Sequence, residues 1–281
     1  MIFFGAHLSM ANGYFAMGKN ALEIGADTLQ FFTRNPRGGS RNAPPNPPQH
    51  DIDDFLDLMK KRHFGPVIAH APYTINLCSA DENIRDVGKM LMRSDLNLLQ
   101  RFDAGTVLYN FHPGCHVGQG AEKGIQLTAQ ALNEILTEET HTHVLLETMS
   151  GKGSEIGASF EEIAQIMNLT NLKCKLGVCL DTCHVFSAGY DIVGRLEEVI
   201  EEFDKIIGMK HLQAIHINDS MTPFASHKDR HAITGKGTIG LTALKAMTRL
   251  KCFDGLPMVL ETPNDLFGYA EEIRILREET P

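Results

Sequence analysis

The sequence predicts an α/β fold, a (β/α)8 or TIM barrel with a metal site at the C-terminal rim of its strands. Two observations predict the barrel. Short apolar or β-branched runs recur eight times in 281 residues, at intervals of roughly 35 residues, close to the unit length of such barrels. Segments with helical periodicity separate these runs, and strands that alternate with helices form a parallel sheet. A doubly wound open sheet is the alternative arrangement.

Each predicted strand is bounded by Gly, Pro or polar residues, as buried strands are. In chain order the strands are Phe3–Leu8, Thr28–Thr33, Pro66–Ala71, Thr106–His112, His143–Thr148, Leu176–Thr182, Leu212–Asn218 and Pro257–Thr262. Apolar residues at i, i+3, i+4 and i+7 predict helices around residues 52–59, 84–91, 160–167 and 196–207.

Two segments are expected to be loops. Residues 35–50 hold five prolines, and residues 220–240 are polar and rich in glycine. Neither has the composition of an interdomain linker. We therefore expect one barrel domain over residues 1–281.

Composition limits the class of protein. No apolar run approaches the ~18 residues of a membrane span, and the N-terminus lacks the basic start of a signal peptide. The six cysteines are therefore expected to be free thiols in a reducing, cytoplasmic compartment. We also expect the protein to be a monomer. A net charge of −9 argues against a nucleic-acid binder that relies on a general basic surface.

Most predicted strands end in a residue type that binds metals. In a parallel barrel these ends share one rim, where barrel active sites lie. Crowded carboxylates there would repel one another, and metal ions remove that cost. The residues at or just beyond strand ends are His7, His70, His112, Glu147, Asp181, His184, His216 and Glu261, with Asp229 and His231 in the loop after the seventh strand.

Because one zinc ion usually has about four ligands, this number of ligand residues exceeds the needs of a single ion, and we expect two or three ions. Imidazole combined with carboxylate favours zinc, with manganese or iron as alternatives. Two ions that share a bridging carboxylate suit in-line phosphoryl displacement. A single His at a strand end is more often a hydrogen-bonded core residue, so the convergence of many ligands supports the metal site. We interpret Cys179 and Cys183, which flank Asp181, as buried thiols rather than ligands.

The same residues lie in motifs that resemble the endonuclease IV family of apurinic/apyrimidinic endonucleases. The resemblance extends from Gly5-Ala6-His7 to Leu260-Glu261-Thr262, nearly the whole chain. The intervening blocks, in order, are Asn110-Phe111-His112-Pro113-Gly114, Leu146-Glu147-Thr148, Gly177–His184 (GVCLDTCH), His216–Ser220 (HINDS) and Asp229-Arg230-His231.

This resemblance implies a TIM barrel with three zinc ions. By motif, His70, His112 and Glu147 would bind one zinc. A second would share Glu147 and add Asp181, His216 and Glu261, and the third would be bound by His184, Asp229 and His231. Glu147 would be the catalytic bridging carboxylate and would help to orient the attacking water.

The implied substrate is double-stranded DNA. The family cleaves the phosphodiester 5′ to an abasic site, leaving a 3′-hydroxyl and a 5′-deoxyribose phosphate, and removes blocking groups from 3′ ends. Flipping the lesion out of the duplex costs least where no base is stacked. Arg37, Tyr73 and Arg230 are the candidate DNA contacts, and the remaining acidic residues are expected on the outer helices.

Other polar residues near the motifs are candidates to hold the ligands in place or to contact a phosphate, because ligand imidazoles usually donate their second N–H to a partner. They are His7, Asn110, His116 and Asn218. A purely structural role is the alternative for each.

Two segments depart from the family pattern. Gly38-Gly39 follows Arg37 where the family has a Gln-aromatic pair, and Thr74 follows Tyr73 where the family has an apolar residue. Smaller side chains fill less of the gap at a flipped nucleotide, so weaker binding or relaxed specificity is expected.

Two other functions remain open. A metal-dependent sugar isomerase or epimerase on a related barrel would also gather Glu, Asp and His at strand ends, but would not need His184, Asp229 and His231 as a third set. A non-catalytic metal-binding or DNA-binding module is the second.

Overall fold

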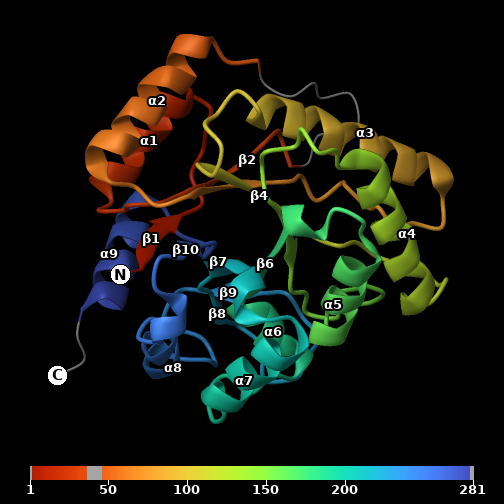
Figure 1. Cartoon of the computed structure of the whole chain (residues 1–281). Helices are drawn as coiled ribbons and strands as arrows, with labels where there is room; N and C mark the ends of the chain where they lie inside the picture. Colours follow the sequence, from red (N-terminus) through yellow and green to blue (C-terminus); the bar gives the residue numbers. More distant parts are fainter. Residues whose placement is uncertain (1, 37–45, 279–281) are drawn as a thin grey trace.

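The computed structural model describes residues 2–36 and 46–278 and confirms the predicted barrel (Figure 1). Eight parallel strands form its wall, and each lies within the run that the sequence predicts for it. The strands are β1 Phe3–Ala6, β2 Gln30–Phe32, β3 Val67–His70, β4 Val107–Phe111, β5 Val144–Glu147, β6 Leu176–Asp181, β7 Leu212–His216 and β10 Pro257–Leu260.

The strands follow the order β1-β10-β7-β6-β5-β4-β3-β2, with parallel pairing at each step. An isolated parallel bridge between His7 and Gln30 joins β1 to β2. The Leu8 amide also donates to the Gln30 carbonyl oxygen at 2.7 Å. These contacts close the barrel at a seam where both strands are short.

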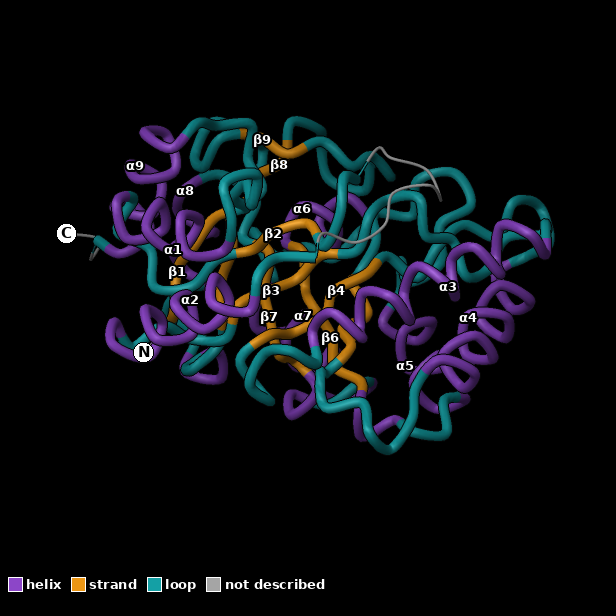
Figure 2. The backbone as a smooth tube through the Cα atoms, turned by 90° about the horizontal axis from the view of Figure 1, so that it is seen from above, coloured by secondary structure: helices purple, strands orange, loops and turns teal. Residues whose placement is uncertain are grey.

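Helices surround the barrel, as the view from above shows with strands in orange and helices in purple (Figure 2). The longer helices α2, α3, α4 and α7 bury apolar residues on one face and expose mostly polar and charged residues on the other. Asp81 and Ser159 cap α3 and α5 by accepting hydrogen bonds from backbone amides two and three residues later. The helices are α1 Tyr14–Glu23, α2 Gln49–Arg62, α3 Glu82–Leu99, α4 Ala121–Ile135, α5 Phe160–Leu169, α6 Thr182–Ala188, α7 Leu196–Ile206, α8 Leu241–Met247 and α9 Leu266–Arg277.

An apolar layer fills the barrel interior below the rim. Its members come from six strands and form a cluster of their own, separate from the larger core between strands and helices. They are Ile68, Leu108, Leu145, Cys179, Ala214 and Val259. Because side chains two apart on a strand share a face, the residues two positions later also point inward, at the rim.

The two predicted loops differ in part from the structure. Helix α2 begins at Gln49, so the first loop is shorter than expected, and its residues 37–45 lie outside the described residues. The second loop contains a short antiparallel hairpin, formed by β8 (Asp219–Ser220) and β9 (His231–Ala232). Two-residue strands carry too little periodicity to be predicted from sequence.

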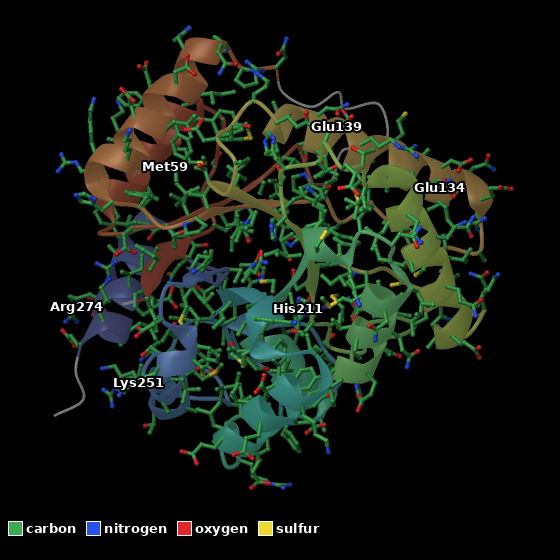
Figure 3. All side chains as sticks on the ribbon, in the orientation of Figure 1. Met59, Glu134, Glu139, His211, Lys251 and Arg274 are labelled. Carbon is green, nitrogen blue, oxygen red and sulfur yellow. The ribbon has the colours of Figure 1, made fainter. Side chains whose placement is uncertain are left out.

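Charged side chains lie on the outer helices, as expected. Glu134 on α4 and Arg274 on α9 project from the periphery (Figure 3). Helix α7 exposes four glutamates, at positions 197, 198, 201 and 202. Within residues 2–36 and 46–278, no helix is both long and apolar enough to cross a membrane.

Candidate metal centre

Four groups of possible metal ligands lie at the rim among the described residues, and three of them contain all nine predicted ligands; the fourth joins Cys183 to Asp181 and His231. Within each group, one ligand atom per residue lies within 4.8 Å of the others. Three of the groups match the sets that the family resemblance implies. They are His70, His112 and Glu147; Glu147, Asp181, His216 and Glu261; and His184, Asp229 and His231.

Glu147 lies at the centre of the cluster and is fully buried. Its Oε2 faces the Nε2 atoms of His70 at 3.2 Å and His112 at 3.4 Å. Its Oε1 faces the Nδ1 atoms of His216 at 3.3 Å and His184 at 3.2 Å. Oε2 therefore points toward the imidazoles of the first group and Oε1 toward His216 of the second, which is the geometry a bridging ligand requires.

Backbone carbonyls orient three of the imidazoles. The rings of His70, His184 and His231 place Nδ1 beside the carbonyl oxygens of Ala71 (2.6 Å), Thr148 (2.9 Å) and Glu261 (3.3 Å). A carbonyl can only accept, so each Nδ1 carries the hydrogen and each neutral ring presents the Nε2 lone pair. All three Nε2 atoms point into the cluster.

The second group is held by an amide as well as by the strands. Asn218 donates to Asp181 Oδ2 at 2.7 Å and accepts from the Glu261 backbone amide at 2.8 Å. His216 Nδ1 lies 3.1 Å from Glu261 Oε2. These contacts join β6, β7 and β10 at the rim.

The third group depends on the hairpin, which brings Asp229 and His231 over α6. Asp219 at its base is fully buried, and its carboxylate accepts five backbone N–H bonds. The donors are Ser220, Gly235, Gly237, Ile239 and Gly240. A side chain at Gly237 would clash with Asp219 Oδ1, so glycine is required for this close approach.

The structure fits metal ions at these groups. Four ligands about 2.0–2.1 Å from a tetrahedral zinc lie roughly 3.3 Å from one another. The Nε2 atoms of His184 and His231 each lie 3.4 Å from Asp229 Oδ1, and both are buried without a hydrogen-bond partner among the described residues. Buried polar atoms rarely lack partners, and a shared cation would satisfy both.

Without a metal, the charges of the cluster favour ionised carboxylates at Glu147 and Asp229 and a protonated imidazole at His184. Burial opposes ionisation of Glu147, but His216 and His112 hold its pKa well below 4.5. Burial also opposes protonation of His184, yet Asp181 and other acids raise its pKa well above 6.5. Burial raises and His184 lowers the pKa of Asp229, to about 2. Metal binding would displace the imidazole protons.

The nearby thiols are buried. Cys179 belongs to the apolar layer, and burial raises its pKa to about 11. Burial likewise raises the pKa of Cys183 to about 11, although its sulfur lies near ligand atoms of Asp181 and His231. Neutral thiols are poor metal ligands, which supports the interpretation of both as structural.

A cleft of about 420 Å³ opens onto the cluster. Tyr73 lines it, is 58% exposed, and stacks edge-on near Phe32 and His70. Arg230 is exposed beside Asp229 on the hairpin, and its guanidinium donates to the Asp229 carbonyl oxygen at 2.7 Å. Arg37 lies outside the described residues.

Of the residues predicted to support the ligands, Asn110 and His7 lie next to a ligand carboxylate, whereas His116 lies in a loop. Asn110 donates to Glu147 Oε2 at 2.5 Å, and His7 lies 3.9 Å from Glu261. Burial lowers the pKa of His7 to about 4, which keeps that ring neutral. His116 instead bonds within the loops after β4 and β5: its Nδ1 accepts from the Gly120 amide, and its own amide donates to Ser154.

Sequence reasoning missed three residues that hold the ligands. The Thr148 carbonyl oxygen accepts from the His184 ring, and its hydroxyl accepts from the Asp181 amide. The Asp219 carboxylate binds the backbone at the base of the hairpin. Gln30 contacts His7, His216 and Glu261. The available signal for Gln30 was an amide within the otherwise apolar run Leu29–Phe32.

Comparison with known proteins adds independent findings. A family model described as a xylose isomerase-like TIM barrel matches residues 19–279. The chain is 55% identical to "Probable endonuclease 4" of Akkermansia muciniphila over 278 residues, which cover 99% of each chain. The aligned region therefore spans nearly the whole chain.

Solved structures agree. The crystal structure of endonuclease IV from Thermus thermophilus is 28% identical, with a TM-score of 0.85 over 98% of this chain and 97% of that chain. A D-tagatose 3-epimerase-like protein is 19% identical, with a TM-score of 0.72 over 98% of this chain and 96% of that one. At that identity, the second likeness shows the fold alone.

Proposed function

The chain belongs to the endonuclease IV family, and from this premise we propose that it is a zinc-dependent DNA-repair endonuclease. The proposed reaction is hydrolysis of the phosphodiester 5′ to an abasic site, with a 3′-hydroxyl and a 5′-deoxyribose phosphate as products. The same site would clear blocked 3′ ends. The substrate is double-stranded DNA carrying these lesions.

The placement of Glu147 carries the proposal. One buried carboxylate faces four imidazoles, two on each oxygen, within 3.2–3.4 Å. Such a carboxylate suits a pair of ions that share it, and the third group lies beside it on the hairpin. When bound, zinc ions would activate water and stabilise negative charge on the phosphate and the leaving oxygen.

The chain's own residues position the reactants. Asn110 donates to Glu147 and restricts rotation of its carboxylate. Tyr73 lines the cleft, where an exposed ring can stack on a nucleotide. Arg230 is exposed between Asp229 and His231, which line the cleft, and its guanidinium can bind a phosphate. Positive charge is thus local, and binding should weaken with salt despite the net charge of −9.

The test is an incision assay. The zinc-loaded protein is mixed with an end-labelled duplex that contains one abasic site, and an undamaged duplex of the same sequence is the control. We expect cleavage 5′ to the lesion with an extendable 3′-hydroxyl, loss of cleavage after chelation, and recovery with zinc. Turnover of a ketohexose without incision would instead favour the epimerase alternative.

A further inference from the structure

The barrel seam differs from the rest of the rim. Strands β1 and β2 supply none of the nine proposed metal ligands. In their place, the bridge that closes the barrel joins His7 to Gln30, and the Gln30 side chain is fully buried. A buried amide normally needs partners for both its oxygen and its nitrogen.

Gln30 finds these partners among the residues of the second group. Its Nε2 donates to Glu261 Oε1 at 2.6 Å and to His7 Nδ1 at 2.9 Å. Its Oε1 lies 2.7 Å from His216 Nε2. Because a carboxylate can only accept, Glu261 fixes which end of the amide is nitrogen, and the oxygen must then face His216.

This orientation determines how His216 presents itself. An amide oxygen can only accept, so His216 Nε2 must carry a hydrogen. In the neutral ring, the lone pair then lies on Nδ1. That atom is 3.1 Å from Glu261 Oε2 and 3.3 Å from Glu147 Oε1. Backbone carbonyls orient His70 and His184 so that these rings present Nε2 to the cluster. The ring of His216 has the opposite orientation, with Nδ1 toward the cluster.

We propose that Gln30 is a positioning residue that holds His216 with Nδ1 turned toward the second group and holds Glu261 in place beside it. The inference rests on the proposed zinc-dependent function. Glutamine meets both demands, whereas leucine or methionine offers neither bond and glutamate lacks the donor for Glu261. Residues that orient metal ligands typically contribute 10–100-fold in metal affinity.

The chain offers a matched control. Gln213 on β7 also donates to an imidazole, His143 Nδ1, at 2.9 Å. It lies at the opposite end of the barrel strands from the ligands, since β7 begins at Leu212 and ends at His216. Replacement of Gln213 removes a similar bond without touching the metal groups.

The experiment measures zinc bound per chain across a series of buffered free zinc concentrations. It compares the wild type with Gln30→Met, Gln30→Glu and Gln213→Met. In Gln30→Met, we expect one zinc to bind about 10–100-fold more weakly while the others keep their affinity. Gln30→Glu should recover part of the loss, because its carboxylate still accepts from His216 Nε2. Gln213→Met should match the wild type.

A second readout follows His216 directly. In zinc-loaded protein labelled with ¹⁵N-histidine, the Nε2–H of His216 should exchange slowly with water in the wild type and at least about tenfold faster in Gln30→Met. Unchanged zinc affinity in Gln30→Met, or an equal loss at every zinc site, would overturn the inference. A wild type that binds no zinc would instead refute the proposed function, so the two failures are distinguishable.

Discussion

Inside the barrel, an apolar layer and a polar layer lie only two residues apart along the strands. Leu145 and Glu147 on β5 illustrate the pair, separated by about 6.6 Å of strand. Both side chains are fully buried. Leu145 belongs to the apolar layer, whereas Glu147 faces four imidazoles. Two equally buried side chains thus have different roles: the apolar layer stabilises the fold, and the polar layer forms the proposed metal site.

The difference teaches that the strand pleat aims both layers inward and that residue type alone separates their roles. A change in the polar layer should remove activity and leave the fold intact. A change in the apolar layer should weaken the fold and leave the chemistry of folded molecules intact.

The largest effect is expected for Glu147→Gln. The amide keeps the shape of the side chain but loses the charge that faces four imidazoles, so incision should fall by about 10³-fold or more. Zinc content should fall with it. Circular dichroism should show an intact fold, and incision at more than about a tenth of the wild-type rate would exclude the bridging role.

Leu145→Ala tests the layer below. Removal of a fully buried leucine should lower the free energy of unfolding by about 2–5 kcal/mol, because the barrel interior cannot collapse around the cavity. Denaturant unfolding measures this loss. Incision per folded molecule should stay within a few-fold of the wild type at a temperature where the variant is folded. A loss as large as that of Glu147→Gln would break the separation.

The two layers should also respond differently to pH. In the metal-free protein, the lowered pKa of Glu147 contributes stability above pH 4.5 that is lost as pH falls through the folded value. The raised pKa of His184 contributes stability that is complete below pH 6.5 and is lost as pH rises through the folded value. The polar layer therefore stabilises the metal-free protein most between about pH 4.5 and 6.5.

Zinc needs neutral imidazoles, so its stabilising effect should grow as pH rises. The increase in Tm on adding zinc, measured by calorimetry, should be larger at pH 8 than at pH 6. The Tm decrease caused by Leu145→Ala should be similar at both, since the apolar layer does not titrate. An equal zinc effect at both pH values would count against imidazole ligation.

The smallest effect is expected at the outer edge of the cleft. Thr74 is exposed next to Tyr73 and fills little space. Thr74→Leu should tighten binding to a duplex with an abasic site by about 3–10-fold, on the order of 1 kcal/mol of added apolar burial. Fluorescence anisotropy measures this, with the undamaged duplex as control. Equal tightening on both duplexes would argue against a contact at the lesion.

Much of this arrangement could be predicted from the sequence. The eight strands alternate with amphipathic helices, and their polar ends had to meet on one rim in a parallel barrel. The three ligand groups then followed from the family motifs. The structure and the comparisons confirm the fold and the family, while the roles of the individual residues stay proposals.

Other features could not be predicted, for physical reasons. An amide such as Gln30 suits a strand, a loop or a surface, so its role emerges only from its partners. The hairpin that holds His231 depends on the buried carboxylate of Asp219 rather than on periodicity. His116 has the residue type of a site residue, but its loop turns it toward Gly120.

The central claim is that three groups at one rim each hold an ion. Anomalous diffraction at the zinc edge from crystals of the zinc-loaded protein tests it most directly. We expect three peaks: one by His70 and His112, one by His216 and Glu261, and one by His184 and Asp229. A single peak, or none beside His184 and Asp229, would contradict it.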